Sequence, residues 1–381
     1  MVDLKLVAAF TLMSALVVGC ASAAESPAPP GKGLTVYHLG NSLTRCIPLE
    51  RLAELFKSVD GRYDYGMQLG GGHRLEQHLS MRNHGNAPGE GSYNIKAPYG
   101  KWDHAFRNYK FDAVIMQTYR SELDEPEKVH RRWPHYTAGS LQAAGKFIDY
   151  VRGNIEPGDS PWYRAHPNTE NVATDRFYIY ATWPTVGDIL EQEGEKTYAG
   201  YWRAEYKGEV QACADFFARL VTRLNERHPD LPVPVRMIPS GHVLAALDVK
   251  IREDRLPGIE AFYERNQGYF MKSRRNNKKV SAFNPDEFVR PAGVLNFYAD
   301  GVHMNDQPHN GRDSGTIGSY VTAATHYATL TGESPVGLTV EPYEQFDPEA
   351  DAELIEAIQE TVWEVVTDNP HTGVSPEAPS E

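Results

Sequence analysis

The stretch that decides the fold is LTVYHLGNSLTRCIPLERLAELF, residues 34–56. Its opening run, LTVYHLG (34–40), is rich in β-branched and aromatic residues, which is typical of a buried strand. The following segment, 48–59, has apolar residues at helical spacing. The chain therefore passes from strand to helix at Gly-Asn-Ser (40–42). A serine there either caps the helix or is a nucleophile exposed at the carboxyl edge of an α/β sheet.

The same alternation continues along the chain. Strands are expected over 111–117, 175–183 and 233–241. Helices are expected over 140–155, 209–229, 314–332 and 351–366. Strands that alternate with longer amphipathic segments favour an α/β fold, with a parallel sheet and helices on both faces.

Two segments do not follow this alternation. Residues 83–110 are rich in Asn, Gly and His, and residues 252–296 carry many charged and aromatic residues. We expect both to be insertions at loop ends, where binding surfaces tend to lie. The main domain then covers 34–335, a helical extension covers 336–366, and 367–381 is expected to be a disordered tail.

Composition excludes one class of partner. The chain has 381 residues, 41% of them hydrophobic, which suits one large domain or two small ones. Its formal net charge is −13, and its main basic cluster, KSRRNNKKV (272–280), is short and reads as a solvated loop. We therefore expect no nucleic-acid binding.

The N-terminus is typical of an exported protein. Residues 1–20 combine an early lysine with an apolar stretch too short to span a membrane. LVVGC (16–20) resembles a bacterial lipobox, which predicts lipidation of Cys20, attachment to a membrane and a tether over 21–33. The alternative is ordinary cleavage after residues 21–23, which would release a soluble periplasmic or secreted protein.

The other two cysteines are Cys46 and Cys213. Export permits a disulfide between them, although sequence alone does not show that they are close. Neither has the spacing of a metal site, and the 14 histidines form no recognised ligand motif. We expect no metal and no cofactor.

Four stretches with polar residues fall at predicted strand ends or before predicted helices. They are GNSLT (40–44), LGGGHRLEQHL (69–79), FDAVIMQTYRSE (111–122) and YADGVHMND (298–306). Together they suit acyl transfer, with Ser42 as nucleophile, His303 as base and Asp300 to orient the imidazole. The glycine run before residue 73 permits a close backbone approach to a developing oxyanion.

In this order, the four stretches resemble the blocks of the SGNH (GDSL-like) hydrolase superfamily. GNSLT resembles the first block, with Asn41 where many members have Asp, and DGVHMN resembles the last. GGGHRLEQHL resembles the second block of carbohydrate-active members. The resemblance implies a flavodoxin-like, three-layer α/β/α fold and a Ser42–His303–Asp300 triad. It also implies an oxyanion hole that includes the backbone of Ser42 and Gly72.

The third block departs from the family pattern. The family has Gly-x-Asn-Asp there, with the Asn side chain in the oxyanion hole, whereas this chain has Tyr119 and Ser121 where the Gly and Asn would fall. Gln117 is a candidate for the missing amide donor.

Three residues near these strand ends are candidates for substrate binding. Tyr119 and Trp183 would stack on sugar rings, or else lie half-buried under a loop. Arg45 would meet an acidic sugar, or else form a salt bridge.

The leading interpretation is an exported, lipid-anchored esterase that removes acyl groups, expected to be acetyl, from a carbohydrate. One alternative is a non-catalytic glycan-binding lipoprotein on the same fold. Another is a lipase or thioesterase of the same superfamily.

Overall fold

The protein is an α/β structure built on a six-stranded sheet. The computed structural model describes residues 33–79, 94–119, 123–124, 139–153, 174–208, 212–267, 292–304 and 315–376. The strands lie in the order β3-β2-β1-β4-β5-β6. Their bounds are β1 Gly33–Gly40, β2 Arg62–Leu69, β3 Asn94–Ile95, β4 Ala113–Gln117, β5 Phe177–Tyr180 and β6 Arg236–Ile238.

Five of these strands run parallel, with Val36 of β1 opposite Ala113 of β4 and Tyr180 of β5 opposite Ile238 of β6. The edge strand β3 is antiparallel to β2. The expectation of a wholly parallel sheet was therefore wrong at this edge, because a two-residue strand that returns beside β2 needs no crossover helix.

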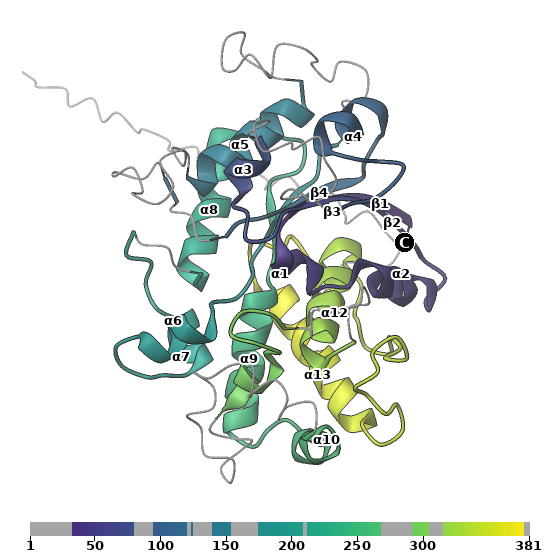
Figure 1. Ribbon diagram of the computed structural model, residues 1–381, viewed down its shortest axis with the longest axis vertical. Helices are drawn as coiled ribbons and strands as arrows, with labels where there is room; N and C mark the ends of the chain where they lie inside the picture. The colour runs from purple at the N-terminus through teal and green to yellow at the C-terminus, as the bar shows by residue number, and fades with distance from the viewer. Residues whose placement is uncertain are drawn as a thin grey trace, which may run out of the picture.

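Helices lie on both sides of the sheet (Figure 1). One side carries α3 (Leu75–Leu79), α4 (Trp102–Asn108), α5 (Ser140–Val151) and α8 (Ala214–Arg227). The other carries α1 (Ser42–Arg45), α2 (Leu49–Lys57), α9 (Ser240–Arg252), α12 (Ile317–Thr331) and α13 (Ala352–Asp368). The remaining elements are α6 (Val186–Glu191), α7 (Tyr198–Trp202), α10 (Ile259–Arg265) and the 3₁₀ helix η3 (Gly293–Phe297); α7 and η3 pack against α9.

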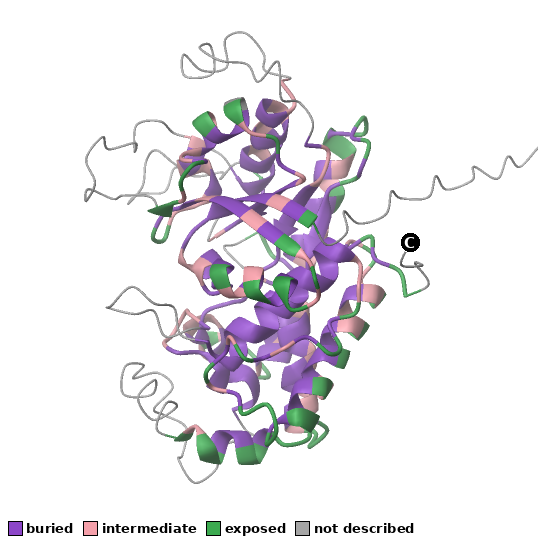
Figure 2. Cartoon of the chain, turned by 90° about the vertical axis from the view of Figure 1, so that its right-hand side faces the viewer, coloured by how far each residue is buried: buried purple, intermediate pink, exposed green. Residues whose placement is uncertain are grey.

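The central strand β1 is buried because helices cover both of its faces. Leu34, Val36, Tyr37 and Leu39 have no solvent exposure. The Tyr37 ring meets Phe106 of α4 edge-on, with ring centroids 4.9 Å apart. Figure 2 shows the buried residues concentrated in the sheet and on the helix faces turned toward it.

The predicted elements and the observed ones coincide over most of the alternating part of the chain. The strands expected at 34–40, 111–117, 175–183 and 233–241 correspond to β1, β4, β5 and β6, and all five predicted helices are present. Strand β2 was not predicted. Its sequence, RYDYGMQL, alternates polar and aromatic residues and contains a glycine, so it lacks an apolar run.

The two expected insertions are partly wrong. Residues 94–110 contain β3 and α4, and Trp102 and Phe106 of α4 are buried in the main core. In the second segment, α10 and η3 bury Phe262 and Leu295 in the same core. Residues 83–93 and 268–291 lie outside the described residues.

The expectation of a disordered tail from residue 367 was wrong as far as residue 376. Helix α13 ends at Asp368, and the next residues pack beside β6, where the Met237 N–H donates to the His371 carbonyl at 2.8 Å. Thr372 is fully buried. The segment has no periodicity because it is held by contacts with β6 and not by a repeating structure of its own.

Cys46 and Cys213 are both buried and form no disulfide. The expected signal, the lipidation site Cys20 and the tether up to residue 32 lie outside the described residues. Among the helices described here, none is both long and apolar enough to cross a membrane.

Candidate functional site

The turn after β1 holds Ser42 at the carboxyl edge of the sheet. The capping residue of α1 is the buried Asn41, whose Oδ1 accepts the Leu43 N–H at 2.8 Å. The Asn41 Nδ2 donates to the His73 carbonyl at 3.0 Å, which joins the turns after β1 and β2. Because Asn41 performs the capping, Ser42 begins the helix and its hydroxyl meets a different partner.

That partner is His303, 261 residues further along the chain. Its Nε2 lies 2.9 Å from the Ser42 Oγ, and its Nδ1 lies 2.7 Å from the Asp300 Oδ2. An ionised carboxylate only accepts hydrogen bonds, so Nδ1 carries the proton in the neutral ring and Nε2 is the acceptor that faces the serine hydroxyl. The structure thus brings together the three residues predicted as a triad.

Asp300 is held through both of its carboxylate oxygens. While Oδ2 faces the imidazole, Oδ1 accepts the backbone N–H groups of Val302 at 2.6 Å and His303 at 2.7 Å. Burial raises the pKa of Asp300, but the hydrogen bond and charge of His303 and these backbone donors outweigh it, so the pKa lies below its ordinary value. Asp300 is therefore ionised at neutral pH.

Backbone N–H groups of two neighbouring turns are candidates for an oxyanion hole. Gly72 lies in an exposed turn closed by the His73 N–H to Gly70 carbonyl bond of 3.0 Å, and its φ of 65° suits glycine. The Gly70 N–H donates to the Gly40 carbonyl, also at 3.0 Å, so this turn is fastened beside the one that bears Ser42. The Ser42 N–H lies in the first turn of α1.

Gln117 is placed at the site but oriented differently from the prediction. Its Oε1 accepts the Asn41 N–H at 2.8 Å and the Thr44 hydroxyl at 3.3 Å. Its Nε2 donates to the Thr118 carbonyl at 2.6 Å. Because the fully buried amide is engaged at both ends with the protein, Gln117 stabilises the nucleophile turn, and the predicted role as an oxyanion donor does not fit this geometry.

The site lies between β1 and β4, whose connections lead to opposite sides of the sheet, which is where ligands bind in open α/β sheets. Tyr119 follows β4 and is partly exposed, and Arg45, in the last turn of α1, is also partly exposed. Both positions are compatible with the predicted contacts to substrate.

Trp183 is the clearest correction among the predicted binding residues. Its side chain is 2% exposed, and its Nε1 donates to the Val302 carbonyl at 2.8 Å. A ring enclosed in this way cannot stack on a sugar. Trp183 instead fits the alternative given for it above, a ring that packs under a loop.

Sequence reasoning missed the residues that hold the site together. Tyr298 is buried and donates its hydroxyl to the Pro184 carbonyl at 2.7 Å. The position of Tyr298 in YADGVH, next to the Asp-His pair, was the only feature of the sequence that could have pointed to this role.

Within the described part of the chain, no three or more His, Cys, Asp or Glu side chains gather in a way that would hold a metal ion.

Comparisons with known proteins give little further information. The chain matches no protein-family profile, and no curated protein matches it. One solved structure, a DUF4886 family protein from Bacteroides uniformis, is similar at 14% identity, with 88% of this chain and 95% of that chain covered and a TM-score of 0.43. A similarity at this level carries no functional argument.

Proposed function

We propose that this protein is a serine esterase that hydrolyses acyl esters through Ser42, His303 and Asp300. The observation that carries the proposal is the pair of short contacts on either side of one imidazole, 2.9 Å to Ser42 Oγ and 2.7 Å to Asp300 Oδ2. A hydroxyl becomes an effective nucleophile when a base takes its proton, and these contacts supply such a base.

In the proposed reaction, the Ser42 Oγ attacks the ester carbonyl while His303 Nε2 takes its proton. His303 then gives that proton to the leaving alcohol, and water hydrolyses the acyl-enzyme by the reverse sequence. Asp300 stabilises the imidazolium that forms in between. The backbone N–H groups of Ser42 and Gly72 are the proposed oxyanion donors.

The finer assignments rest on the resemblance to SGNH hydrolases. The parallel strands alone follow the order β2-β1-β4-β5-β6, which is the order of flavodoxin-like sheets and supports an SGNH-type fold. An acetylated carbohydrate is the proposed substrate, with Tyr119 and Arg45 as its contacts. Export and a lipid anchor on Cys20 belong to the same proposal.

One observation favours a second candidate, a glycan-binding protein without catalysis. The amide of Gln117 is bound to the protein at both ends, so the side-chain donor that the family supplies from its third block is missing at this position. A weaker oxyanion hole lowers the rate of hydrolysis by about 10²–10³ for each lost donor and leaves binding unaffected.

The test compares Ser42→Ala with Ser240→Ala on aryl acetates, an aryl thioester and acetylated polysaccharides. Ser240 is a matched control because it also follows a strand, β6, and begins a helix, α9. We expect Ser42→Ala to lose at least about 10³-fold in kcat/KM and Ser240→Ala to retain activity. Full activity in Ser42→Ala would refute the proposal. Glycan binding without hydrolysis in the unmodified protein would favour the second candidate.

A further inference from the structure

The loop that carries Asp300 and His303 is bound to a segment of another part of the chain. We define the base loop as residues 298–304 and the clamp segment as residues 183–186, which follow β5. Three hydrogen bonds join them. They are Trp183 Nε1 to the Val302 carbonyl at 2.8 Å, Tyr298 hydroxyl to the Pro184 carbonyl at 2.7 Å, and Val186 N–H to the Gly301 carbonyl at 2.9 Å.

The two side chains that donate lie in the protein interior, whereas the accepting residues Gly301 and Val302 are partly exposed. Trp183 and Tyr298 are 2% and 3% exposed. The bond to the Pro184 carbonyl is buried and the bond to the Val302 carbonyl is partly buried. A carbonyl shielded from water that loses its donor costs free energy, up to the full desolvation penalty where it is fully buried. The base loop therefore has a strong preference for the position in which all three bonds form.

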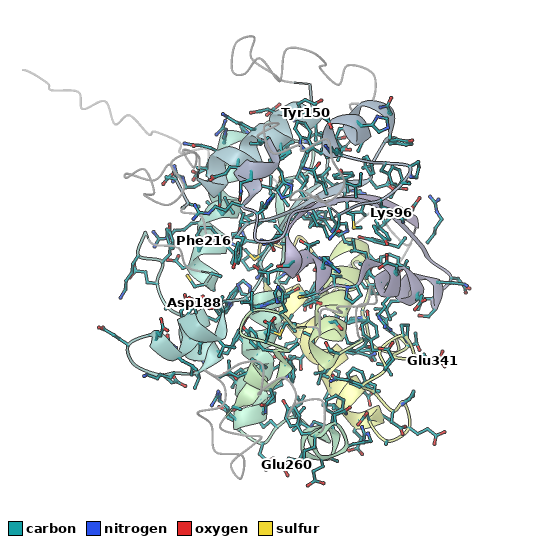
Figure 3. All side chains as sticks on the ribbon, viewed as in Figure 1. Lys96, Tyr150, Asp188, Phe216, Glu260 and Glu341 are labelled. Carbon is teal, nitrogen blue, oxygen red and sulfur yellow. The ribbon has the colours of Figure 1, made fainter. Side chains whose placement is uncertain are left out.

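The clamp segment is itself fixed at both ends. On one side, the Ala181 N–H donates to the Ile238 carbonyl of β6 at 3.0 Å. On the other, Thr185 begins α6 in a capping box with Asp188, which is labelled in Figure 3; the Asp188 N–H donates to the Thr185 hydroxyl at 3.1 Å. The segment can thus impose a position on the base loop and need not follow it.

We propose that Trp183 is a positioning residue for the catalytic base: its indole N–H holds the Val302 carbonyl and thereby sets the distance from His303 to Ser42. This inference rests on the proposed esterase function. Val302 directly precedes His303, and its own N–H is bound to Asp300 Oδ1. A displacement of Val302 therefore moves both the carboxylate and the imidazole relative to the serine.

The test is Trp183→Phe, which retains an aromatic ring and removes the donor. Its matched control is Trp202→Phe: Trp202 is also 2% exposed, but its indole N–H has no hydrogen-bond partner among the described residues. A second pair removes a hydroxyl. Tyr298→Phe deletes the bond to Pro184, and Tyr343→Phe deletes a buried hydroxyl that is unpartnered in the described part of the chain.

Two readouts are needed. In assays on an aryl acetate, we expect Trp183→Phe to lower kcat about 10- to 100-fold, the effect of a small misplacement of a reacting group. KM should stay within about 2-fold because the enclosed ring does not touch substrate. Tyr298→Phe should act in the same direction, and both controls should retain kcat.

The second readout is hydrogen exchange measured by mass spectrometry. Exchange in the base loop should be faster in Trp183→Phe than in Trp202→Phe.

The outcomes separate the two proposals. Unchanged kcat and unchanged exchange in Trp183→Phe would overturn the positioning role. An equal fall in kcat for Trp202→Phe would overturn it too, because loss of packing would then explain the effect. If the unmodified protein hydrolyses no ester, the esterase proposal fails, and the exchange measurement still decides whether the indole N–H holds the base loop.

Discussion

Gln117 shows how a single buried amide stabilises the turn that carries Ser42. The amide oxygen accepts the Asn41 N–H and the amide nitrogen donates to the Thr118 carbonyl. Gly40 must be a glycine beside it, because a Cβ there would lie 2.3 Å from the Thr44 Oγ1 and 2.8 Å from the Gln117 Oε1. The end of β1, the start of α1 and the end of β4 are thus held by one side chain.

This geometry predicts a loss of stability as well as of activity in Gln117→Met. Both backbone groups would be left buried without a partner, so we expect the free energy of unfolding in urea to fall by about 1–3 kcal/mol and kcat to fall with it. Thr44→Val, which deletes only the 3.3 Å contact, should have a smaller effect on both. A Gln117→Met variant with unchanged stability and reduced kcat would instead indicate an oxyanion donor.

At the scale of elements, the start of α12 contacts the end of the base loop at Met304. Thr316, which caps α12, donates its hydroxyl to the Met304 carbonyl at 2.6 Å. Gly318 lies against the same residue: a Cβ at 318 would be 2.9 Å from both Met304 Cβ and Met304 O. A helix with a side chain at this position cannot approach the loop as closely.

We therefore expect Gly318→Ala to lower the free energy of unfolding by about 1–3 kcal/mol and to reduce kcat by moving His303. The matched control is Gly145→Ala in α5, where the new Cβ would meet the movable guanidinium of Arg227 at 3.0 Å. That variant should be neutral or stabilised, since alanine favours helix by about 1 kcal/mol over glycine. Urea denaturation and aryl-acetate assays of both variants provide the check. Equal behaviour of the two variants would contradict the prediction.

The short helix α3 carries the most perturbed carboxyl group among the described acids. Burial raises the pKa of Glu76 to about 7, against a smaller opposing effect of Arg74, and its Oε1 makes no hydrogen bond within the described residues. When the pKa of a carboxyl is higher in the folded state than in the unfolded state, the carboxyl makes its full contribution to stability at pH values below the unfolded pKa, near 4.3. That contribution is lost as the pH rises through about 7.

Glu76→Gln removes this titration. We expect its free energy of unfolding, relative to the unmodified protein, to rise between pH 4 and pH 8 by about 3 kcal/mol at most. Urea denaturation across this range measures the difference. Glu353→Gln, which removes an exposed carboxylate of α13, is the control for loss of a surface charge. A pH-independent difference for Glu76→Gln would show that the pKa of Glu76 is the same in the folded and unfolded states.

At the scale of the whole molecule, the last helix is part of the core. Leu354, Ile358, Val362 and Val366 of α13 are buried, and α13 packs against α12 and α9. Burying side chains of this size contributes about 1.5–3 kcal/mol each. Their sum is comparable with the whole stability of a domain, about 5–15 kcal/mol.

Removal of residues 352–381 should therefore abolish cooperative unfolding in thermal denaturation followed by circular dichroism, and the chain should aggregate in gel filtration. A double variant on the exposed face of the same helix, Glu356→Ala with Glu360→Ala, should melt close to the unmodified protein. A truncated chain that still melts cooperatively would show that the residues before 352 form a stable domain without α13.

The sequence by itself determined the local features of this protein. Hydrophobic periodicity identified β1, β4, β5, β6 and the helices α2, α5, α8, α12 and α13, because side-chain spacing along a buried strand or an amphipathic helix is a local property. It did not identify α9. The order of the four polar stretches also selected Ser42, Asp300 and His303. Strand β2 was missed because its pattern is polar and aromatic.

Only the tertiary structure decided which groups meet. The contact between Ser42 and His303 crosses 261 residues, the direction of the Gln117 amide depends on the Asn41 N–H, and the burial of Trp183 depends on the base loop that covers it. Residues 369–376 are ordered by contacts with β6 and not by any pattern of their own. These features depend on the partners of each hydrogen-bonding group in space, and residue spacing along a chain carries no information about such partners.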